Sequence, residues 1–367
     1  MWILLACAFR EPAQTPPLVA ARGPVRVVEG PVRPGTVSVV VRAGSAYDPP
    51  GREGLAWIAA HSVAPDAVVD VGPEIVRIDL ASAALTTGVL NLSPNEAAVA
   101  TARAAALSEL RGGDCESTAL RAWDSWALAG HPYGHAVEGR ASVIPTITAS
   151  EVHAFLRARY TRDATRVAAA GPLDVAPLDS LLPTLSRRVT PAVPPPMTAS
   201  PRLWVSAPVG TSCVAIGRAD DGAVNAAEVA TLRALARAIG AEADSTVRAE
   251  SMVRWALPLG EAASAASVEN VWNRVTSQRT ISRVPRALGL MQPAPSASRL
   301  AAEDLLPGLP RLSLALLPDE AEVGTTLARV LDASRLRMVV IAPDLTRFHS
   351  VESPAPMAVQ SIEDLLR

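Results

Sequence analysis

The feature that most constrains the fold of this chain is a proline-rich segment near its middle. Five prolines fall within the twelve residues Thr190-Pro-Ala-Val-Pro-Pro-Pro-Met-Thr-Ala-Ser-Pro201. Proline has no backbone N–H and its ring obstructs a helical turn, so neither a helix nor a central strand can run through this segment. We therefore predict a linker at 188–202, between domains at 25–187 and 203–345, with a tail at 346–367. A chain of 367 residues suits two domains of about 150 to 180 residues each.

Composition indicates a folded protein and excludes one class of partner. Hydrophobic residues make up 49% of the chain and charged residues 19%, which provides material for two cores. The formal net charge of −2 gives no global attraction to nucleic acid or to an anionic membrane surface. We therefore expect no nucleic acid among the partners.

The first 24 residues favour a leader or a tether. Residues 4–7 read Leu-Leu-Ala-Cys, the form of a bacterial lipoprotein cleavage box in which Cys7 would be acylated, and a proline-rich stretch follows over 10–24. The apolar start is too short for a transmembrane helix and has no positive n-region. A lipidated Cys7 would place the chain in the bacterial cell envelope or periplasm. The alternative is a chance apolar start or a truncated gene, with a cytoplasmic chain.

The three cysteines, Cys7, Cys115 and Cys213, lie far apart in the sequence. They lack the C-x-x-C spacing that would suggest a metal or redox site. A disulfide between Cys115 and Cys213 stays open, because no feature of the sequence favours it.

Hydrophobic periodicity and capping signals predict a similar order of elements in both halves. Thr148 and Glu151 form a capping box for one predicted helix. Because residues 163–171 and 335–344 resemble one another, we interpret the chain as an internal repeat of two α+β domains. The expected strands are 25–29, 37–42, 75–80, 166–170, 203–205, 212–217 and 337–342, and the expected helices are 53–63, 95–111, 151–160, 225–239 and 323–331.

The predicted helix at 53–63 has the spacing of a metallopeptidase zinc helix without its chemistry. In the inverted motif H-x-x-E-H, two histidines four residues apart on one helix face bind zinc, and the glutamate beside the second histidine activates a water. Here these three places hold Trp57, Ala60 and His61. One ligand and the general base are therefore missing.

An ordered series of residues follows this helix along the chain. With it, the chain resembles the insulinase and pitrilysin family of inverzincin metallopeptidases, especially its short bacterial and processing-peptidase-like members. The resemblance covers residues 25–180 and extends in architecture over 201–345. It implies an α+β fold of two similar domains, each an antiparallel-rich sheet packed with helices and both shortened here, around a cavity that holds extended peptides. The residues that carry it are Glu109, His131-Pro-Tyr-Gly134, Gly139, Ile147, Thr148, Val152, Phe155, Tyr160 and Gly171.

The resemblance also assigns roles to single residues. His61 matches the second zinc histidine and Glu109 the glutamate ligand, whereas Trp57 replaces the first histidine and Ala60 the general base. One His and one Glu fall short of the three protein ligands that a catalytic zinc keeps, and alanine cannot deprotonate water. We therefore expect no catalytic residue, and zinc enters only through the resemblance, with His61 and Glu109 as residual ligands. The alternative for His61 is a packing residue, with Trp57 filling the vacated metal pocket.

The segment around His131 allows two interpretations. His131 and His135 flank a Pro-Tyr-Gly sequence that suits a structural turn. Alternatively, these two histidines could join Glu138 and Cys115 in a different metal cluster, although the spacing follows no known site. The sequence contains no Gly-rich phosphate loop, G-x-S-x-G elbow or Cys-His signature, so it offers no support for Ser-based hydrolysis.

Three functions follow as hypotheses. The first is a non-catalytic homologue that serves as the structural or substrate-binding subunit of an active, zinc-bearing sibling peptidase, with extended peptides as further ligands. The second is an envelope-anchored peptide-binding or scaffold protein. The third is a residual zinc metalloendopeptidase. Whether the chain is an enzyme stays open, and the missing residues at 57 and 60 favour that it is not.

Overall fold

The structure is a computed structural model of the 367-residue chain, and it describes ten segments together with seven single residues. None of the described helices is both long and apolar enough to cross a membrane. The described segments are 18–22, 25–29, 36–81, 92–170, 202–219, 252–261, 263–284, 320–331, 336–348 and 357–361, and the single residues are 231, 234, 235, 238, 239, 301 and 305.

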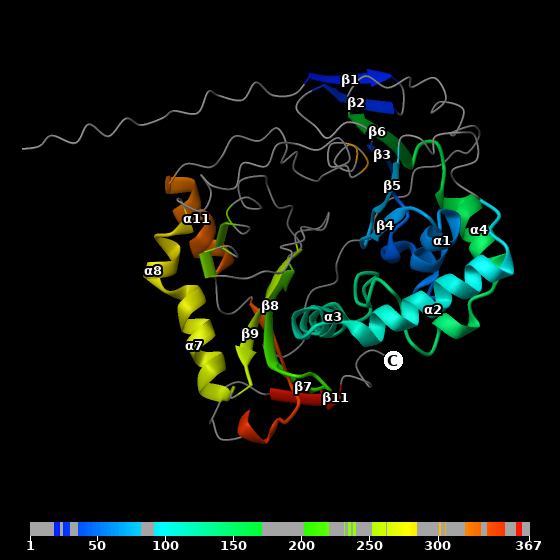
Figure 1. Ribbon diagram of the computed structural model, residues 1–367. Helices are drawn as coiled ribbons and strands as arrows, with labels where there is room; N and C mark the ends of the chain where they lie inside the picture. Colours follow the sequence, from blue (N-terminus) through cyan, green and yellow to red (C-terminus); the bar gives the residue numbers. More distant parts are fainter. Residues whose placement is uncertain are drawn as a thin grey trace, which may run out of the picture.

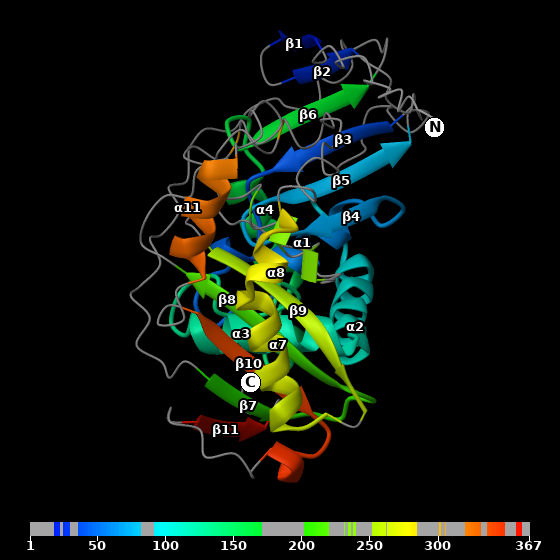
Figure 2. The same ribbon diagram turned by 90° about the vertical axis from the view of Figure 1, so that its left-hand side faces the viewer.

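The strands form two separate sheets, one in each half of the chain (Figure 2). The first sheet has the order β1-β2-β6-β3-β5-β4, and all its strand pairs are antiparallel except the parallel pair of β2 and β6. Its strands are β1 (Leu18–Arg22), β2 (Val25–Glu29), β3 (Thr36–Val41), β4 (Val68–Val71), β5 (Val76–Ala81) and β6 (Thr165–Ala170).

The second sheet has the order β11-β7-β10-β8-β9. Here β7 pairs in parallel with both β10 and β11, whereas β8 pairs antiparallel with β10 and β9. Its strands are β7 (Arg202–Ser206), β8 (Ser212–Ala219), β9 (Met252–Gly260), β10 (Arg337–Ala342) and β11 (Met357–Ser361).

The two sheets share one topology. The series β2-β6-β3-β5 and β7-β10-β8-β9 have the same chain order and the same parallel and antiparallel pairs. The helix α4 (Ala149–Arg159) precedes β6, as α11 (Glu320–Val330) precedes β10. The predicted fold class is therefore confirmed, and the sequence similarity between 163–171 and 335–344 falls on equivalent strands.

Helices α1 (Leu55–Val63), α2 (Glu96–Gly112) and α4 pack on one face of the first sheet. Their apolar side chains form one core with Val39, Val41 and Ile78 of the strands. The start of α4 is capped as the sequence predicts: Thr148 and Glu151 form both bonds of a capping box. The short helices η1 (Ser45–Tyr47) and η3 (Ile144–Thr146) lie in the connections.

Both faces of the second sheet are covered by helices. Successive side chains of a strand point to opposite sides, so each strand contributes to both faces. Val214, Ile216 and Trp255 pack with helices α7 (Ala265–Thr276), α8 (Gln278–Ile281) and α11 on one face. Cys213 and Ala215 pack on the other face with α3 (Cys115–Ala127), a helix of the first half (Figure 1). The second half contributes in return, since Ala301 and Leu305 pack against Val40 and Ala168 of the first sheet.

Several predictions differ from the structure. The predicted tether at 1–24 contains β1, and the predicted tail at 346–367 contains η4 (Thr346–Phe348) and β11. Both strands extend a sheet edge through backbone hydrogen bonds, which depend little on side-chain pattern. The helix predicted at 225–239 is described only at 231, 234, 235, 238 and 239, which are helical. Cys7 and residues 188–201 of the predicted linker lie outside the described residues, and Arg202, the last residue of that linker, begins β7.

Candidate functional site

Helix α1 is held in place at its first turn by a partly buried carboxylate. Asp48 accepts hydrogen bonds from the backbone N–H groups of Gly54, at 2.7 Å, and Ala56, at 2.6 Å. These are N–H groups that a helix start leaves without intrahelical partners. Burial raises the pKa of Asp48 well above its usual value, and the two hydrogen bonds act against that rise. Asp48 therefore fixes the start of the helix that carries positions 57, 60 and 61.

A close backbone contact packs a later segment against the same helix start. Gly54 and Gly139 both have positive φ values, 105° and 104°. A Cβ atom on Gly139 would lie 2.3 Å from the carbonyl oxygen of Glu53, so only glycine fits there. The Gly139 that belongs to the family-like series thus has a structural reason for its place.

His61 lies on α1 with its ring stacked on the indole of Trp57. The ring centroids are 3.5 Å apart and the planes differ by 17°. Nδ1 of His61 lies 2.9 Å from the carbonyl oxygen of Trp57. A carbonyl can only accept, so we assign the ring proton of neutral His61 to Nδ1, which leaves the lone pair on Nε2.

Glu109 on α2 is close enough to His61 for the two to interact electrostatically. Burial lowers the pKa of His61, while the hydrogen bond to Trp57 and the charge of Glu109 raise it to a smaller extent. The imidazole is therefore neutral at pH 7. The pair assigned by resemblance is brought together, with His61 half-buried and Glu109 exposed.

The remaining two positions of the motif cannot supply the missing chemistry. Ala60 is fully buried among apolar side chains and has no heteroatom that could accept a proton. Trp57 is 8% exposed, and its indole fills the space beside the His61 ring. Among the described residues, no group of three or more His, Cys, Asp or Glu side chains could hold a metal ion. The residues present do not fit a catalytic zinc.

The alternative metal cluster around His131 is wrong. Cys115 forms a disulfide with Cys213, so it offers no thiolate ligand. Glu138 instead forms an ion pair of 2.9 Å with Arg121. Nδ1 of His131 accepts the backbone N–H of Tyr133, which ties the histidine into the turn.

The His131-Pro-Tyr-Gly134 segment is a tight turn with a structural role. A Cβ atom on Gly134 would lie 2.1 Å from the carbonyl oxygen of Leu128, so the turn requires glycine. The Nδ1 atom of His135 lies 2.8 Å from the carbonyl oxygen of Ala136. These contacts support the structural interpretation of the segment.

Sequence reasoning missed a buried polar network that involves this turn. The hydroxyl of Tyr133 donates to Glu74, which lies 3.9 Å from the Arg42 guanidinium. Arg42 in turn donates to the hydroxyl of Tyr47 at 2.7 Å. Burial, followed by the charge of Glu74, raises the pKa of Tyr47 to about 12. The network joins the end of β3 to the turn, and no sequence pattern links residues 59 positions apart.

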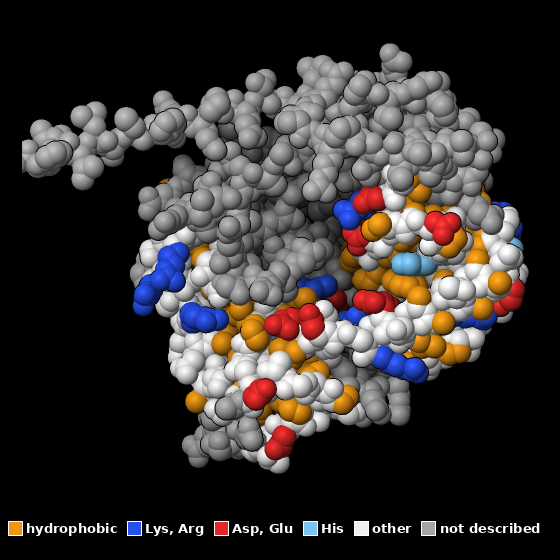
Figure 3. Space-filling view, viewed as in Figure 1, with side chains coloured by type: hydrophobic (Ala, Val, Ile, Leu, Met, Phe, Trp, Pro, Cys, Tyr) orange, Lys and Arg blue, Asp and Glu red, His pale blue; other side chains and the backbone are white. Residues whose placement is uncertain are grey.

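Strand β4 lies at the edge of the first sheet and packs beside α1. In the part of the chain that the structure describes, β4 pairs with β5 alone. Val68 is 68% exposed and shares one side of the strand with Asp70. Figure 3 shows hydrophobic side chains gathered around a histidine in this region of the surface. Within the described residues, the α1 region therefore adjoins a strand that has a paired neighbour on one side only.

Replacing Glu109 by glutamine is expected to lower the pKa of His61 further, because it removes a charge that favours the imidazolium. NMR titration of the His61 ring measures this directly, with Glu116→Gln on α3 as the control. In both proteins stability should fall as the pH drops below about 6.5, because the unfolded state then binds a proton that folded His61 resists. If the pKa of His61 is unchanged in the Glu109 variant, the charge of Glu109 does not act on His61.

Comparison with known proteins shows the fold. No model of a known protein family matches the chain, and no curated protein matches it either. Among solved structures, a peptidase M16 inactive domain from Pseudomonas fluorescens is similar, with a TM-score of 0.62, 16% identity and coverage of 90% of this chain and 98% of that one. A protease from Helicobacter pylori has a TM-score of 0.63 and 16% identity, covering 89% and 99%. An M16-like peptidase from Alicyclobacillus acidocaldarius has a TM-score of 0.60 and 12% identity, covering 90% and 99%. The chain thus has the fold of M16, or insulinase-type, peptidases.

Proposed function

We propose that this chain is a non-catalytic relative of the M16 peptidases that serves as the structural or substrate-binding partner of an active, zinc-bearing sibling. The observation that carries the proposal is the arrangement of the side chains on α1. Trp57 covers His61 and Ala60 is buried in the core, while the contacts that position the helix are intact. A scaffold that keeps its geometry and lacks its ligands suits binding better than hydrolysis.

Extended peptides are the ligands that we propose for the edge of the first sheet. An added strand would form backbone hydrogen bonds with β4 and place side chains near Val68 and Asp70. Val68 offers apolar surface, and Asp70 forms a 3.3 Å ion pair with Arg77 on the neighbouring strand. The resemblance of the fold to peptidases supports the same class of ligand.

The test compares the chain alone with a mixture of the chain and an active M16-type peptidase from the same cell. We expect no cleavage of unstructured peptides by the chain alone, and a higher rate for the mixture than for the sibling alone. Hydrogen exchange should show slower exchange of the β4 amides when a non-cleavable extended peptide binds. Failure to associate with any such sibling would contradict the partnership, and unchanged exchange in β4 would contradict the peptide site.

A second candidate function is an envelope-anchored peptide-binding or scaffold protein. The Cys115–Cys213 disulfide supports it, because disulfides persist mainly in oxidising compartments outside the cytoplasm. Mass spectrometry of the membrane fraction should then find an acylated Cys7. An unmodified Cys7 in a soluble fraction would favour the first candidate.

We do not propose the residual zinc endopeptidase, because His61 and Glu109 alone do not make a catalytic site. If a preparation did hydrolyse a peptide, His61→Ala would test whether this chain is responsible. Hydrolysis that survives the substitution belongs to another protein.

A further inference from the structure

Helix α3 belongs to the first half by sequence and to the second half by packing. Its side chains Ala119, Ala122 and Trp123 are fully buried, and they form one core with Leu203 and Ile341 of the second sheet. Figure 2 shows the helix beside the strands of that sheet. The helix therefore carries the main described contact between the two halves.

Two polar contacts fix α3 on the second sheet. The indole N–H of Trp123 donates to the backbone carbonyl of Arg337 at 3.1 Å. Asp124 and Arg254 form an ion pair of 2.7 Å, with side chains only 5% and 10% exposed. The indole hydrogen bond is directional, and together with the buried ion pair it defines the position of α3 on the sheet.

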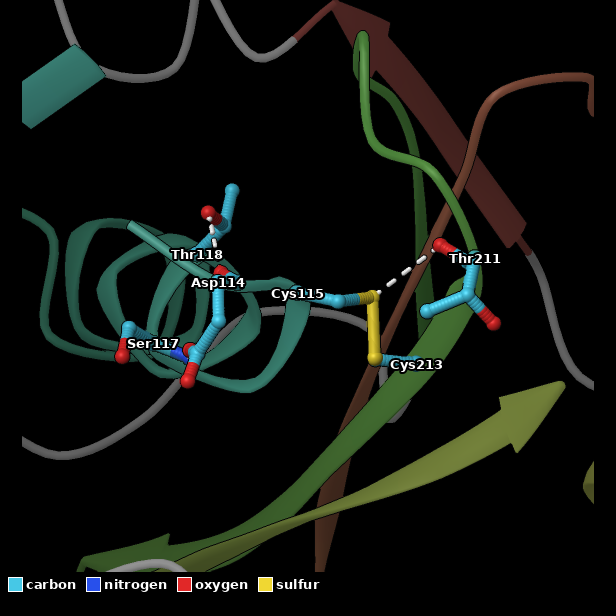
Figure 4. The surroundings of a disulfide bond; sticks show 6 residues. All are labelled: Asp114, Cys115, Ser117, Thr118, Thr211 and Cys213. Atoms are coloured by element: carbon cyan, nitrogen blue, oxygen red, sulfur yellow. Dashed lines mark hydrogen bonds between the residues drawn. A yellow bond between two sulfur atoms is a disulfide. The ribbon is translucent and has the colours of Figure 1, made fainter. Parts of the chain in front are cut away.

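The disulfide lies at the first residue of α3 and reaches the second strand of the other half (Figure 4). Cys115 and Cys213 are 98 residues apart, and their exposed fractions are 7% and 0%. The sulfur of Cys115 also lies 3.1 Å from the carbonyl oxygen of Thr211. A disulfide sulfur has no hydrogen to donate, so this contact becomes a hydrogen bond only in the reduced thiol.

We propose that the Cys115–Cys213 disulfide is a covalent clasp between the two halves, formed when the chain folds in an oxidising compartment. In this step two thiols exchange with a small disulfide oxidant. The S–S bond of the protein forms, the S–S bond of the oxidant breaks, and the two electrons and two protons leave with the oxidant as two thiols. Without the bond, the halves depend on the linker and on the non-covalent contacts of α3 and of Ala301 and Leu305.

The burial of both sulfurs indicates a structural disulfide that forms once, and not one that is repeatedly reduced and reoxidised. A thiolate reductant must reach a sulfur in line with the S–S bond, and the seated α3 covers Cys213. We therefore expect reduction of the native protein to be at least about tenfold slower than reduction in denaturant. Equal rates would show that the bond is exposed in solution.

The decisive experiment cuts the chain between its halves. A specific protease site is placed within residues 190–201 of the full chain, in a Cys7→Ser background, and the protein is cleaved. Without reductant, we expect one band of intact mass on a denaturing gel, and two bands after reduction. The matched variant Cys213→Ser should give two bands in both cases. Two bands from the cleaved, unreduced protein with cysteines 115 and 213 would overturn the proposal.

A second measurement tests whether the disulfide is needed to hold the two halves together when α3 is packed on the second sheet. We expect the cleaved, oxidised protein to elute as one species in native gel filtration at every dilution. After reduction, the two pieces should separate on dilution, because only non-covalent contacts remain, those of α3 and those of Ala301 and Leu305 with the first sheet. If the reduced pieces stay together at the lowest measurable concentration, the bond does not serve as the clasp. Neither readout depends on the function that we propose for α1.

Discussion

Replacing Trp123 by alanine is expected to lower the free energy of unfolding by about 3 to 5 kcal/mol. The indole is fully buried between α3 and the second sheet, so its removal leaves a large cavity. The substitution also leaves the carbonyl of Arg337 without its indole donor. Urea unfolding, followed by circular dichroism, measures the loss.

The matched control for this change is Trp126→Ala on the same helix. Trp126 is only partly buried against the same cluster, so its removal should cost much less. A Trp123 variant that loses no more than the Trp126 variant would show that α3 does not rest on the second sheet as described.

Replacing Asp124 by alanine is expected to cost about 3 to 5 kcal/mol of stability, because it leaves the buried guanidinium of Arg254 without its carboxylate. The charge cannot leave with a proton, since arginine stays protonated in proteins. The double variant Asp124→Ala/Arg254→Met should recover most of this loss, because it removes the uncompensated charge as well. Unfolding free energies of the two single variants and the double variant form the necessary cycle.

An exposed ion pair provides the comparison. The Arg77–Asp70 pair has side chains that are 41% and 61% exposed, so Asp70→Ala should change stability by less than about 1 kcal/mol. If Asp124→Ala costs as little as Asp70→Ala, solvent reaches the junction and the two halves are not closely packed there.

Most of the strands and the helices of the first half could be predicted from the sequence. Val37 to Arg42 and Arg337 to Ala342 are β-branched and apolar runs that end at turns, and Thr148 gives a specific capping signal. Helix α3 has local signals that could have found it, since Asp114 caps it and its apolar residues recur every three or four positions. Its packing partner could not be predicted, because the second sheet lies about a hundred positions further along the chain.

The same reason explains which parts of the site could not be predicted from the sequence. The motif places Trp57, Ala60 and His61 on one helix, and the structure adds that the indole stacks on the imidazole. The sequence left the pairing of Cys115 with Cys213 undecided, because the two cysteines meet only where α3 packs against β8. Long-range partners follow from tertiary packing, which local periodicity does not encode.

Zinc stoichiometry, measured by elemental analysis after dialysis against a weak chelator, tests the central claim most directly. The claim is that α1 keeps the position of a zinc helix but cannot hold the metal. We expect no bound zinc on the natural chain. We expect about one zinc on the Trp57→His variant, in which the substitution completes three protein ligands with His61 and Glu109. About one zinc per natural chain would contradict the account and make the chain a metalloprotein.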